Sequence, residues 1–302
     1  MSLTVLEPGL QSRIVDFGRP TSRSLGVPIG GAADHWSLSL GNALVGNPPE
    51  RPALEITLTG PTLRAESEIG AVVFGAPFNL ASDRQPLVSG KTFTLKRGEI
   101  LRIGGTPRGM RAYLCVPGGF VTPSILGSRS ALEPLGAEQT LVCSSSSLPA
   151  RFLPDSANIT LPRQFPQILR TLPGSQADWF ASAALASRTF SVTNESNRMG
   201  LRLKSKRIAR PKREMVSEPV CPGTIQVAND GQCIVLGVDG QTIGGYPKIA
   251  QVIRADLDSL GQLRPGDSVR FSEVSLEQAE ETFRHKMSEL QRWLVRLAVA
   301  TN

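Results

Sequence analysis

One turn, residues 244–248 with the sequence Gly-Gly-Tyr-Pro-Lys, combines groups that could recognise a small ligand. The glycine pair lets the backbone approach a ligand closely, because neither residue has a Cβ atom. The proline fixes the backbone that leaves the turn. With Gln241, the segment offers an amide, a phenol and an ammonium group around one small surface. An ordinary hairpin loop with polar decoration is the alternative interpretation.

Many other segments match those of one protein family in the same order. They are residues 16–19, 26–34, 42–47, 53–57, 126–130, 173–178, 196–203, 223–227 and 265–271. On these segments and the turn, the chain resembles the biotin-dependent carboxyltransferase and allophanate hydrolase subunit 2 family. That family includes the C-type component of bacterial 5-oxoprolinase, the kinase-inhibitor antagonist proteins and the carboxyltransferase region of urea amidolyase. The resemblance covers the chain up to about residue 271.

The resemblance implies both a fold and an activity. The fold is expected to be mainly β, with two cyclophilin-like β-barrel domains, few short helices and a C-terminal amphipathic helix. The expected activity is that of the C-type component of an ATP-dependent 5-oxoprolinase-like complex, which hydrolyses a cyclic amide. The alternatives are a urea-type biotin-dependent carboxyltransferase component and a non-catalytic regulatory binding protein of the kinase-inhibitor antagonist type. Val15, which stands where the family usually has glutamine, keeps the last alternative open.

The same resemblance implies a set of site residues, because work on an amide needs cations for carboxylate or phosphate oxygens and donors for the amide oxygen. Arginine suits a bidentate clamp on a carboxylate, whereas lysine acts as a point charge. The expected catalytic residues are Lys248, Tyr246, Gln241 and Asp16. The expected substrate-binding residues are Arg198, Gly244, Gly245, Arg19, Asp34 and Glu55.

Several of these residues also have a structural interpretation. Asp16 and Arg19 could pair with each other across a turn, and Glu55 could accept hydrogen bonds from backbone donors at a strand. Asp34 is a good helix N-cap. Arg129, between two serines, could anchor a loop.

Cofactors and partners follow from the resemblance too. The sequence contains no Gly-x-x-x-x-Gly-Lys-[Ser/Thr] loop, so ATP is expected to act through the complex. Biotin is expected only if another protein carries it. The expected partner is the B-like component of such a complex, a protein of the allophanate hydrolase subunit 1 type, and the expected substrate is a small amide or urea-like compound.

Composition excludes several other classes. The four cysteines show no Cys-x-x-Cys spacing and there are only two histidines, so we expect no metal site and no histidine-led triad. The net charge of +7 owes much to a basic run between residues 204 and 213, which lacks interleaved aromatics, so we expect no nucleic-acid partner. A solvated, mobile loop is the preferred interpretation of that run, and contact with an acidic partner subunit is the second. With no signal peptide and no long apolar run, we expect a cytoplasmic protein without membrane contact.

The elements that must position these groups are expected to be mostly strands, because 29 glycines and 23 prolines suit a turn-rich β architecture. One helix should begin after Asp34 and end at Gly46, and a short one should span about 178–187. A helix after Ser275 is predicted by apolar spacings of three and four and by a Ser275–Gln278 capping box. The expected domains are 1–148 and 167–274, joined by a Ser/Pro-rich linker, 149–166, and followed by a C-terminal helix, 275–302.

Overall fold

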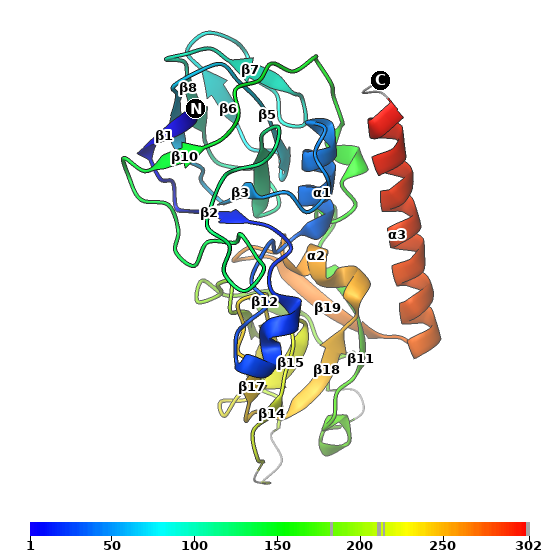
Figure 1. Ribbon diagram of the computed structural model, residues 1–302. Coiled ribbons are helices and arrows are strands. Elements are labelled where there is room, and N and C mark those ends of the chain that lie inside the picture. Colours follow the sequence, from blue (N-terminus) through cyan, green and yellow to red (C-terminus); the bar gives the residue numbers. More distant parts are fainter. Residues whose placement is uncertain (182–183, 210–212, 214, 300–302) are drawn as a thin grey trace. The chain divides into compact units, whose positions relative to one another are not determined.

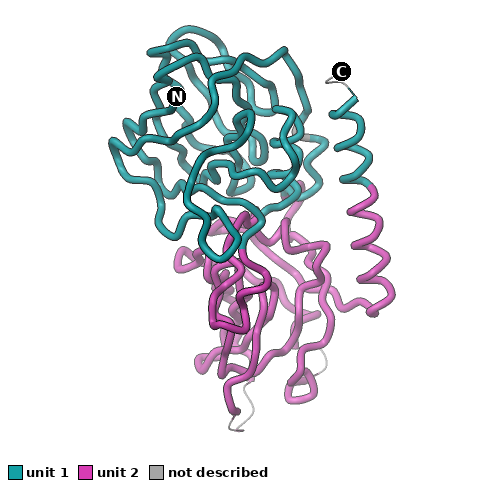
Figure 2. The backbone as a smooth tube through the Cα atoms, viewed as in Figure 1, with its two compact units in different colours: residues 1–18, 34–161, 289–302 teal, residues 19–33, 162–288 magenta. Residues whose placement is uncertain are grey.

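The computed structural model describes residues 1–181, 184–209, 213 and 215–299. Strands dominate these residues, and the mainly β fold expected from the sequence is confirmed (Figure 1). Contacts divide the chain into two compact units. The first unit comprises residues 1–18, 34–161 and 289–302, and the second comprises 19–33 and 162–288 (Figure 2).

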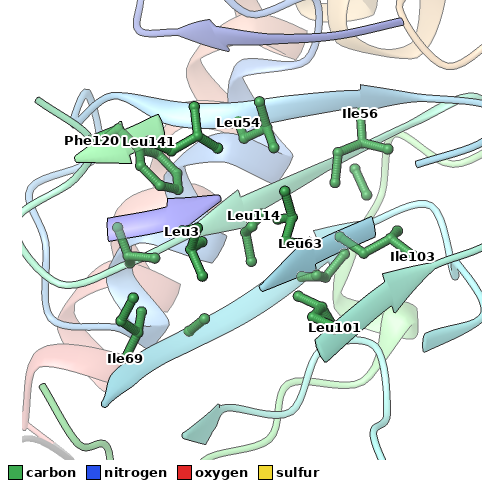
Figure 3. Close-up of a cluster of buried hydrophobic side chains, with 14 of the residues drawn as sticks. Leu3, Leu54, Ile56, Leu63, Ile69, Leu101, Ile103, Leu114, Phe120 and Leu141 are labelled. Carbon is green, nitrogen blue, oxygen red and sulfur yellow. The ribbon is translucent and has the colours of Figure 1, made fainter. Parts of the chain in front are cut away.

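The first unit contains ten strands in two five-stranded sheets. One sheet has the order β10-β1-β4-β8-β6 and the other β2-β3-β9-β5-β7. The strands are β1 (Ser2–Glu7), β2 (Gln11–Val15), β3 (Ala53–Thr57), β4 (Thr62–Ala65), β5 (Ile69–Gly75), β6 (Leu80–Ser82), β7 (Phe93–Leu95), β8 (Ile100–Ile103), β9 (Arg111–Cys115) and β10 (Thr140–Val142). Apolar side chains from both sheets fill one core, which includes Leu3, Leu54 and Leu101 (Figure 3).

Helix α1 (His35–Leu44) belongs to the same unit and packs against β5 and β9. Its predicted N-cap is confirmed, because the Asp34 side chain accepts a hydrogen bond from Ser37 N at 2.9 Å. The short 3₁₀ helix η2 (Asp155–Ala157) follows β10. Residues 158, 160 and 161 are buried in this unit, so the segment expected to be a linker, 149–166, packs with the first unit up to residue 161, and its last residues count with the second.

The second unit is a closed, seven-stranded barrel with the order β11-β18-β15-β16-β13-β12-β19. Only β11 and β19 pair in parallel. The barrel strands are β11 (Gln167–Pro173), β12 (Phe190–Val192), β13 (Gly200–Lys204), β15 (Thr224–Val227), β16 (Cys233–Leu236), β18 (Lys248–Val252) and β19 (Ser268–Glu273). Apolar side chains that alternate along these strands, such as Leu201, Leu203, Ile225 and Val227, form its core.

Shorter elements accompany the barrel. Strands β14 (Glu218–Pro219) and β17 (Ile243–Gly244) pair with each other and form a small separate ribbon. The others are η1 (Pro20–Leu25), η3 (Ala177–Trp179), η4 (Arg254–Asp256) and α2 (Leu257–Leu260). The helix predicted near 178–187 is wrong for the described part, where η3 makes only one 3₁₀ turn; residues 182–183 lie outside the described residues. Segment 19–33, expected in the first domain, counts with the second unit.

Helix α3 (Leu276–Val299) confirms the predicted C-terminal helix. Both bonds of its capping box are present, since Ser275 N donates to Gln278 Oε1 at 2.9 Å and Gln278 N donates to Ser275 Oγ at 3.2 Å. Within the second unit, Ala279 and Phe283 pack against Ile253 and Ala255. No helix in the described part of the chain is long and apolar enough to cross a membrane.

Candidate functional site

Lys248 begins β18 and is the centre of a polar cluster on the second unit. Its side chain is only 7% exposed, and its ammonium group is paired with the carboxylate of Glu218 in β14. Gln176 completes the cluster, because its Oε1 accepts a hydrogen bond from Lys248 N at 3.1 Å and its Nε2 donates to Glu218 Oε2 at 3.3 Å. Lys248, followed by Gln176, holds the pKa of the Glu218 carboxyl below its ordinary value. The cluster thus contains a buried cation flanked by an amide and a carboxylate.

Gln226 in β15 lies directly opposite Lys248 in the β15–β18 pairing. Ile225 and Val227, on either side of Gln226, belong to the apolar core of the barrel, so Gln226 faces the outer side and its pairing partner Lys248 lies on that side too. The Gln226 side chain is 1% exposed and its Nε2 donates to the carbonyl oxygen of Tyr246 at 3.4 Å. Its Oε1 is buried and has no hydrogen-bond partner among the described residues. An amide with an unused acceptor therefore stands beside the buried cation.

The glycine turn fits closely over this amide. A Cβ atom on Gly244 would lie 2.5 Å from Gln226 Nε2, so a side chain at this position would push the Gln226 amide aside. Tyr246 is half-buried. It lines an open hollow of about 450 Å³ together with Thr193, Arg202 and Gln232. Gln241 and Gly245 are exposed. The structure thus brings Gly244, Tyr246 and Lys248 together around Gln226, while Gln241 has no described contact with them.

Arg198 and Arg19 lie in a second cluster of the same unit. The Arg198 guanidinium is bidentate on Asp239, with distances of 2.7 Å from Nε to Oδ2 and 2.9 Å from Nη2 to Oδ1. Its Nη2 also donates to Gly31 O at 2.6 Å. A Cβ atom on Gly30 would lie 3.4 Å from Arg19 Nη1 and 3.9 Å from Asp239 Oδ1, so Arg19 reaches the same cluster. Arg198 is a clamp, as expected for arginine, but the carboxylate it grips belongs to the protein.

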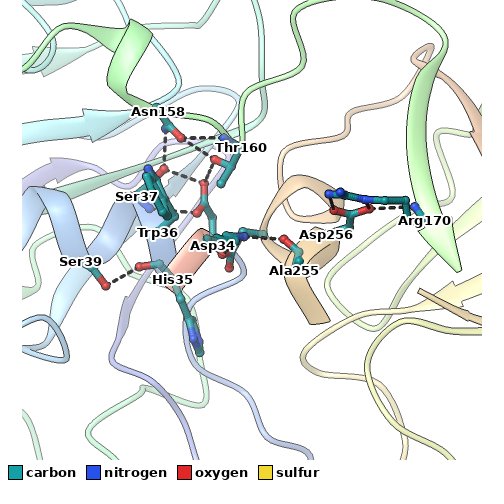
Figure 4. Close-up of polar contacts among 12 residues, drawn as sticks. Asp34, His35, Trp36, Ser37, Ser39, Asn158, Thr160, Arg170, Ala255 and Asp256 are labelled. Carbon is teal, nitrogen blue, oxygen red and sulfur yellow. Dashed lines mark hydrogen bonds and ion pairs between the residues drawn. The ribbon is translucent and has the colours of Figure 1, made fainter. Parts of the chain in front are cut away.

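The first unit holds Asp34 and Glu55 in one buried polar network. Figure 4 shows the part of it around Asp34, Ser37, Asn158 and Thr160. The Asp34 carboxylate accepts hydrogen bonds from Ser37 Oγ at 2.6 Å and Thr160 Oγ1 at 2.7 Å. Asn158 Nδ2 in turn donates to Ser37 Oγ at 2.7 Å. Asp34 is therefore surrounded by donors of its own unit, which agrees with its structural interpretation as an N-cap.

Tyr113 connects Asp34 to Glu55. Its hydroxyl accepts from Asp34 N and donates to Glu55 Oε2, each at 2.9 Å. Burial and, secondly, the charge of Glu55 raise the pKa of Tyr113 well above its ordinary value, so the phenol stays protonated and can donate. Arg111 Nε lies 3.5 Å from Glu55 Oε1 and balances its charge. Glu55 thus accepts from a side chain of the neighbouring strand β9.

Asp16 anchors a loop of the first unit. It accepts hydrogen bonds from Ser128 Oγ at 2.5 Å, Ser130 Oγ at 2.6 Å, Arg129 N at 2.6 Å and Gly18 N at 2.8 Å. Burial works to raise the pKa of the Asp16 carboxyl, but these hydrogen bonds outweigh it and hold the pKa below its ordinary value. Arg129 also holds the loop, since its Nη1 donates to Thr122 O at 2.7 Å.

Sequence reasoning missed the partners of Lys248. Gln176 and Gln226 both lie in segments that carry the family resemblance, 173–178 and 223–227, so the signal was present but was not tied to a role. Glu218 precedes a proline in a segment with no motif, and only the fold brings it to Lys248.

Cys115, Cys143 and Cys233 are buried free thiols, and Cys221 is exposed. Burial raises the pKa of Cys143 to about 11 and that of Cys233 to about 12. In the described ranges no three His, Cys, Asp or Glu side chains gather as a metal site would require. Part of the basic run, residues 210–212, lies outside the described residues.

Comparisons with known proteins agree with this architecture. The model of the family described as carboxyltransferase domain, subdomain A and B, matches residues 25–273. The C-type components of the 5-oxoprolinases of Haemophilus influenzae and Escherichia coli are 33% and 34% identical over 287 residues, which are 92% of this chain and 93% of each relative. The solved structure of Kluyveromyces lactis urea carboxylase matches 97% of this chain with a TM-score of 0.86 and 27% identity. This chain spans 29% of that protein.

Proposed function

Because the chain belongs to the family of carboxyltransferase domains with subdomains A and B, we propose that it is the C-type component of a 5-oxoprolinase-like complex. In this proposal the complex hydrolyses a cyclic amide: water adds to the ring carbonyl, the C–N bond breaks, and the nitrogen takes a proton to give an open-chain amino acid. The proposed partner is the B-like component, a protein of the allophanate hydrolase subunit 1 type. Two relatives that carry the name of this 5-oxoprolinase component, each matched over 93% of its length, support it.

The observation that carries the proposal is the surroundings of Lys248. 5-Oxoproline has one carboxylate and one ring amide, and the site offers one buried ammonium group with the amides of Gln176 and Gln226 close to it. Lys248 would hold the carboxylate, the two amides would orient the ring, and Tyr246 would handle a proton of the reaction. Gly244 would keep the backbone close to the ligand.

ATP and biotin enter the proposal only through other proteins. Two buried cations of the second unit are already paired, Lys248 with Glu218 and Arg198 with Asp239, and Arg198 is 4% exposed. Paired and buried cations fit a triphosphate poorly, and the sequence has no phosphate-binding loop. We therefore assign no step on this chain to either cofactor.

A urea-type carboxyltransferase component is the second candidate. The match of 97% of this chain to the Kluyveromyces lactis urea carboxylase structure favours it. The same lysine would then hold a carboxylate or carbamate oxygen, and the biotin would arrive on another protein. A regulatory protein of the kinase-inhibitor antagonist type remains the outcome if neither reaction is found.

The test uses the chain purified together with its neighbouring subunits. Glutamate formed from 5-oxoproline is measured with and without ATP. Formation only with ATP and all subunits supports the proposal, whereas avidin-sensitive fixation of bicarbonate into urea favours the second candidate. Absence of both reactions, together with tight binding to a partner protein, favours the regulatory alternative.

Lys248→Ala is the matching variant, and it should lower turnover by at least about a hundredfold because the buried cation proposed to hold the carboxylate is removed. The far-UV circular dichroism and the melting temperature should stay close to those of the parent protein, since Lys248 packs outside the apolar core. Lys206→Ala, which changes an exposed lysine of the same unit, is the control. Full activity of Lys248→Ala would remove Lys248 from the site.

A further inference from the structure

The β14–β17 ribbon, residues 218–219 and 243–244, covers the two groups best suited to a ligand that has both a carboxylate and an amide. We propose that this ribbon is a displaceable lid, that Glu218 occupies the place of the ligand carboxylate on Lys248, and that Gln226 Oε1 accepts the ligand N–H. The inference rests on the proposed function and deepens it, since it names the groups that recognise a carboxylated amide.

Gln226 provides the first argument. The carbonyl oxygen of Tyr246 accepts a hydrogen bond, and only the NH₂ group of the Gln226 side chain can donate it, which fixes the orientation of the amide. Oε1 then points elsewhere and remains buried without a partner among the described residues. Buried acceptors without donors are rare because they lose their hydrogen bonds to water and gain none. A ligand N–H would supply the missing donor.

The ion pair provides the second argument, because its two members are unequally exposed. The Lys248 side chain is 7% exposed, whereas that of Glu218 is 43% exposed. The cation is thus fixed in the fold and its carboxylate partner lies at the surface. A half-exposed carboxylate contributes little free energy to such a pair, so another carboxylate can replace it at small cost. Gln176, which donates to Glu218 at 3.3 Å, could donate equally to the incoming carboxylate.

The pairing of the strands explains how one ligand can use both groups. Gln226 and Lys248 are direct cross-strand neighbours on the outer face of the barrel, and Cβ atoms of such neighbours lie about 4.5–5.5 Å apart. In 5-oxoproline the carboxylate is attached to the carbon next to the ring nitrogen. Its carboxylate and N–H are therefore close enough together to engage Lys248 and Gln226 at the same time.

The ribbon links the two events. Glu218 lies opposite Gly244 in the β14–β17 ladder, and Gly244 lies against the Gln226 amide. The carboxylate that occupies Lys248 and the glycine that covers Gln226 therefore belong to one small element. Its ladder has only two residue pairs and is continued by a 3.0 Å hydrogen bond from Val220 N to Thr242 O and by Arg23 Nη2, which donates to Val220 O. A ligand that takes Lys248 from Glu218 removes a contact that keeps Gly244 over Gln226. Replacement of Glu218 by the ligand carboxylate on Lys248 thus occurs together with exposure of Gln226 Oε1.

The experiment measures binding of 5-oxoproline and of N-methyl-5-oxoproline to the full chain with its partner subunits, by calorimetry. Glu218→Gln should bind 5-oxoproline at least about fivefold more tightly, because the internal competitor for Lys248 is gone. The parent protein should prefer 5-oxoproline over the N-methyl compound by about tenfold, and Gln226→Leu should lose that preference. Glu273→Gln and Gln167→Leu, at an exposed carboxylate and at a half-buried amide that donates to Ile168 O, are the matched controls and should behave like the parent.

Weaker or unchanged binding by Glu218→Gln overturns the proposal, and so does an N–H preference that survives in Gln226→Leu. Hydrogen exchange in the parent protein covers the case in which Gln226→Leu does not fold. There the amide of Gly244 should exchange faster when 5-oxoproline is bound, and an unchanged or slower rate overturns the lid. These outcomes are separate from failure of the proposed function, which would appear as absence of glutamate with the complete parent complex.

Discussion

Lys248 and Arg198 show how much the surroundings of a residue decide its role. Both are nearly buried cations in segments that carry the family resemblance, and both were expected to hold an anion. The Arg198 guanidinium donates two hydrogen bonds to Asp239 and one to Gly31 O. Lys248 is paired with one half-exposed carboxylate, that of Glu218. The donors of Arg198 are engaged with the protein itself. Lys248 is therefore the better candidate for ligand binding.

Arg198→Lys should destabilise the protein by about 2 kcal/mol, because lysine cannot make the two parallel bonds to Asp239 and the bond to Gly31 at once. Urea unfolding of the variant and the parent would measure the difference. Arg202→Lys, at an arginine that is 53% exposed, should change stability by less than about 0.5 kcal/mol. Unchanged stability of Arg198→Lys, combined with lost turnover, would return this arginine to the ligand site.

Asp16 predicts a pH dependence. Its folded pKa lies below the unfolded value of about 3.9, so its contribution to stability is present above that pH and is lost as the pH falls through the folded pKa. Asp16→Asn should thus be less stable than the parent at pH 7, and the difference should shrink below about pH 4. Denaturant unfolding between pH 3 and pH 7 checks this. A difference that stays constant with pH would mean that the carboxylate charge is irrelevant to the loop.

At the scale of elements, helix α1 shows how a cap can become part of a network. The sequence predicted that Asp34 would cap the helix, and it does so through Ser37 N. The Asp34 carboxylate also accepts hydrogen bonds from Ser37 Oγ and Thr160 Oγ1. The backbone N of Asp34 donates a hydrogen bond to the Tyr113 hydroxyl. The start of α1 is therefore tied to β9 and to the segment around residue 160.

Asp34→Ala should cost about 2–4 kcal/mol, because it removes the cap, leaves the buried Ser37 hydroxyl without its acceptor and takes one of two acceptors from Thr160 Oγ1. Thermal unfolding followed by circular dichroism at 222 nm would show the loss. Asp83→Ala is a suitable control in the same unit, since Asp83 is exposed and accepts a single backbone hydrogen bond from Ile100 N. If Asp34→Ala lost no more stability than Asp83→Ala, the buried hydrogen bonds of Asp34 would contribute no more than the single bond of an exposed aspartate.

For the whole molecule, the main result is that the second unit is not continuous in sequence. Residues 19–33 lie between two parts of the first unit along the chain but count with the barrel. Gly31 O accepts from Arg198, and Gly30 N donates to Val238 O at 2.9 Å. The segment therefore supplies backbone groups that the barrel needs.

Residues 162–288 produced alone should consequently fold poorly, and a synthetic peptide of residues 19–33 should restore folding. Dispersed amide signals in a two-dimensional ¹H–¹⁵N NMR spectrum should appear when the peptide is added. A peptide with Arg19→Ala should act more weakly, because Arg19 reaches the Arg198–Asp239 cluster. Well-dispersed signals of 162–288 without any peptide would contradict the assignment of 19–33 to this unit.

The sequence determined the features that depend on local order. Turn residues and short apolar runs predicted the mainly β fold, and the caps at Asp34 and Ser275 predicted two helices, because a capping side chain bonds backbone groups only two or three positions away. The ordered motifs predicted the family, and they identified Gly244, Tyr246 and Lys248, which one strand and its turn hold together. All of these are recognisable without knowing which distant segments meet.

The tertiary structure decided which groups meet across the chain. Glu218 and Lys248 are 30 residues apart, Arg19 and Arg198 are far more distant, and segment 19–33 joined the barrel rather than the domain that precedes it in sequence. Strand pairing alone placed Gln226 opposite Lys248. A side chain in a motif shows what it can bond but not what it will bond, because its partners are brought to it only when the strands pair and the barrel closes.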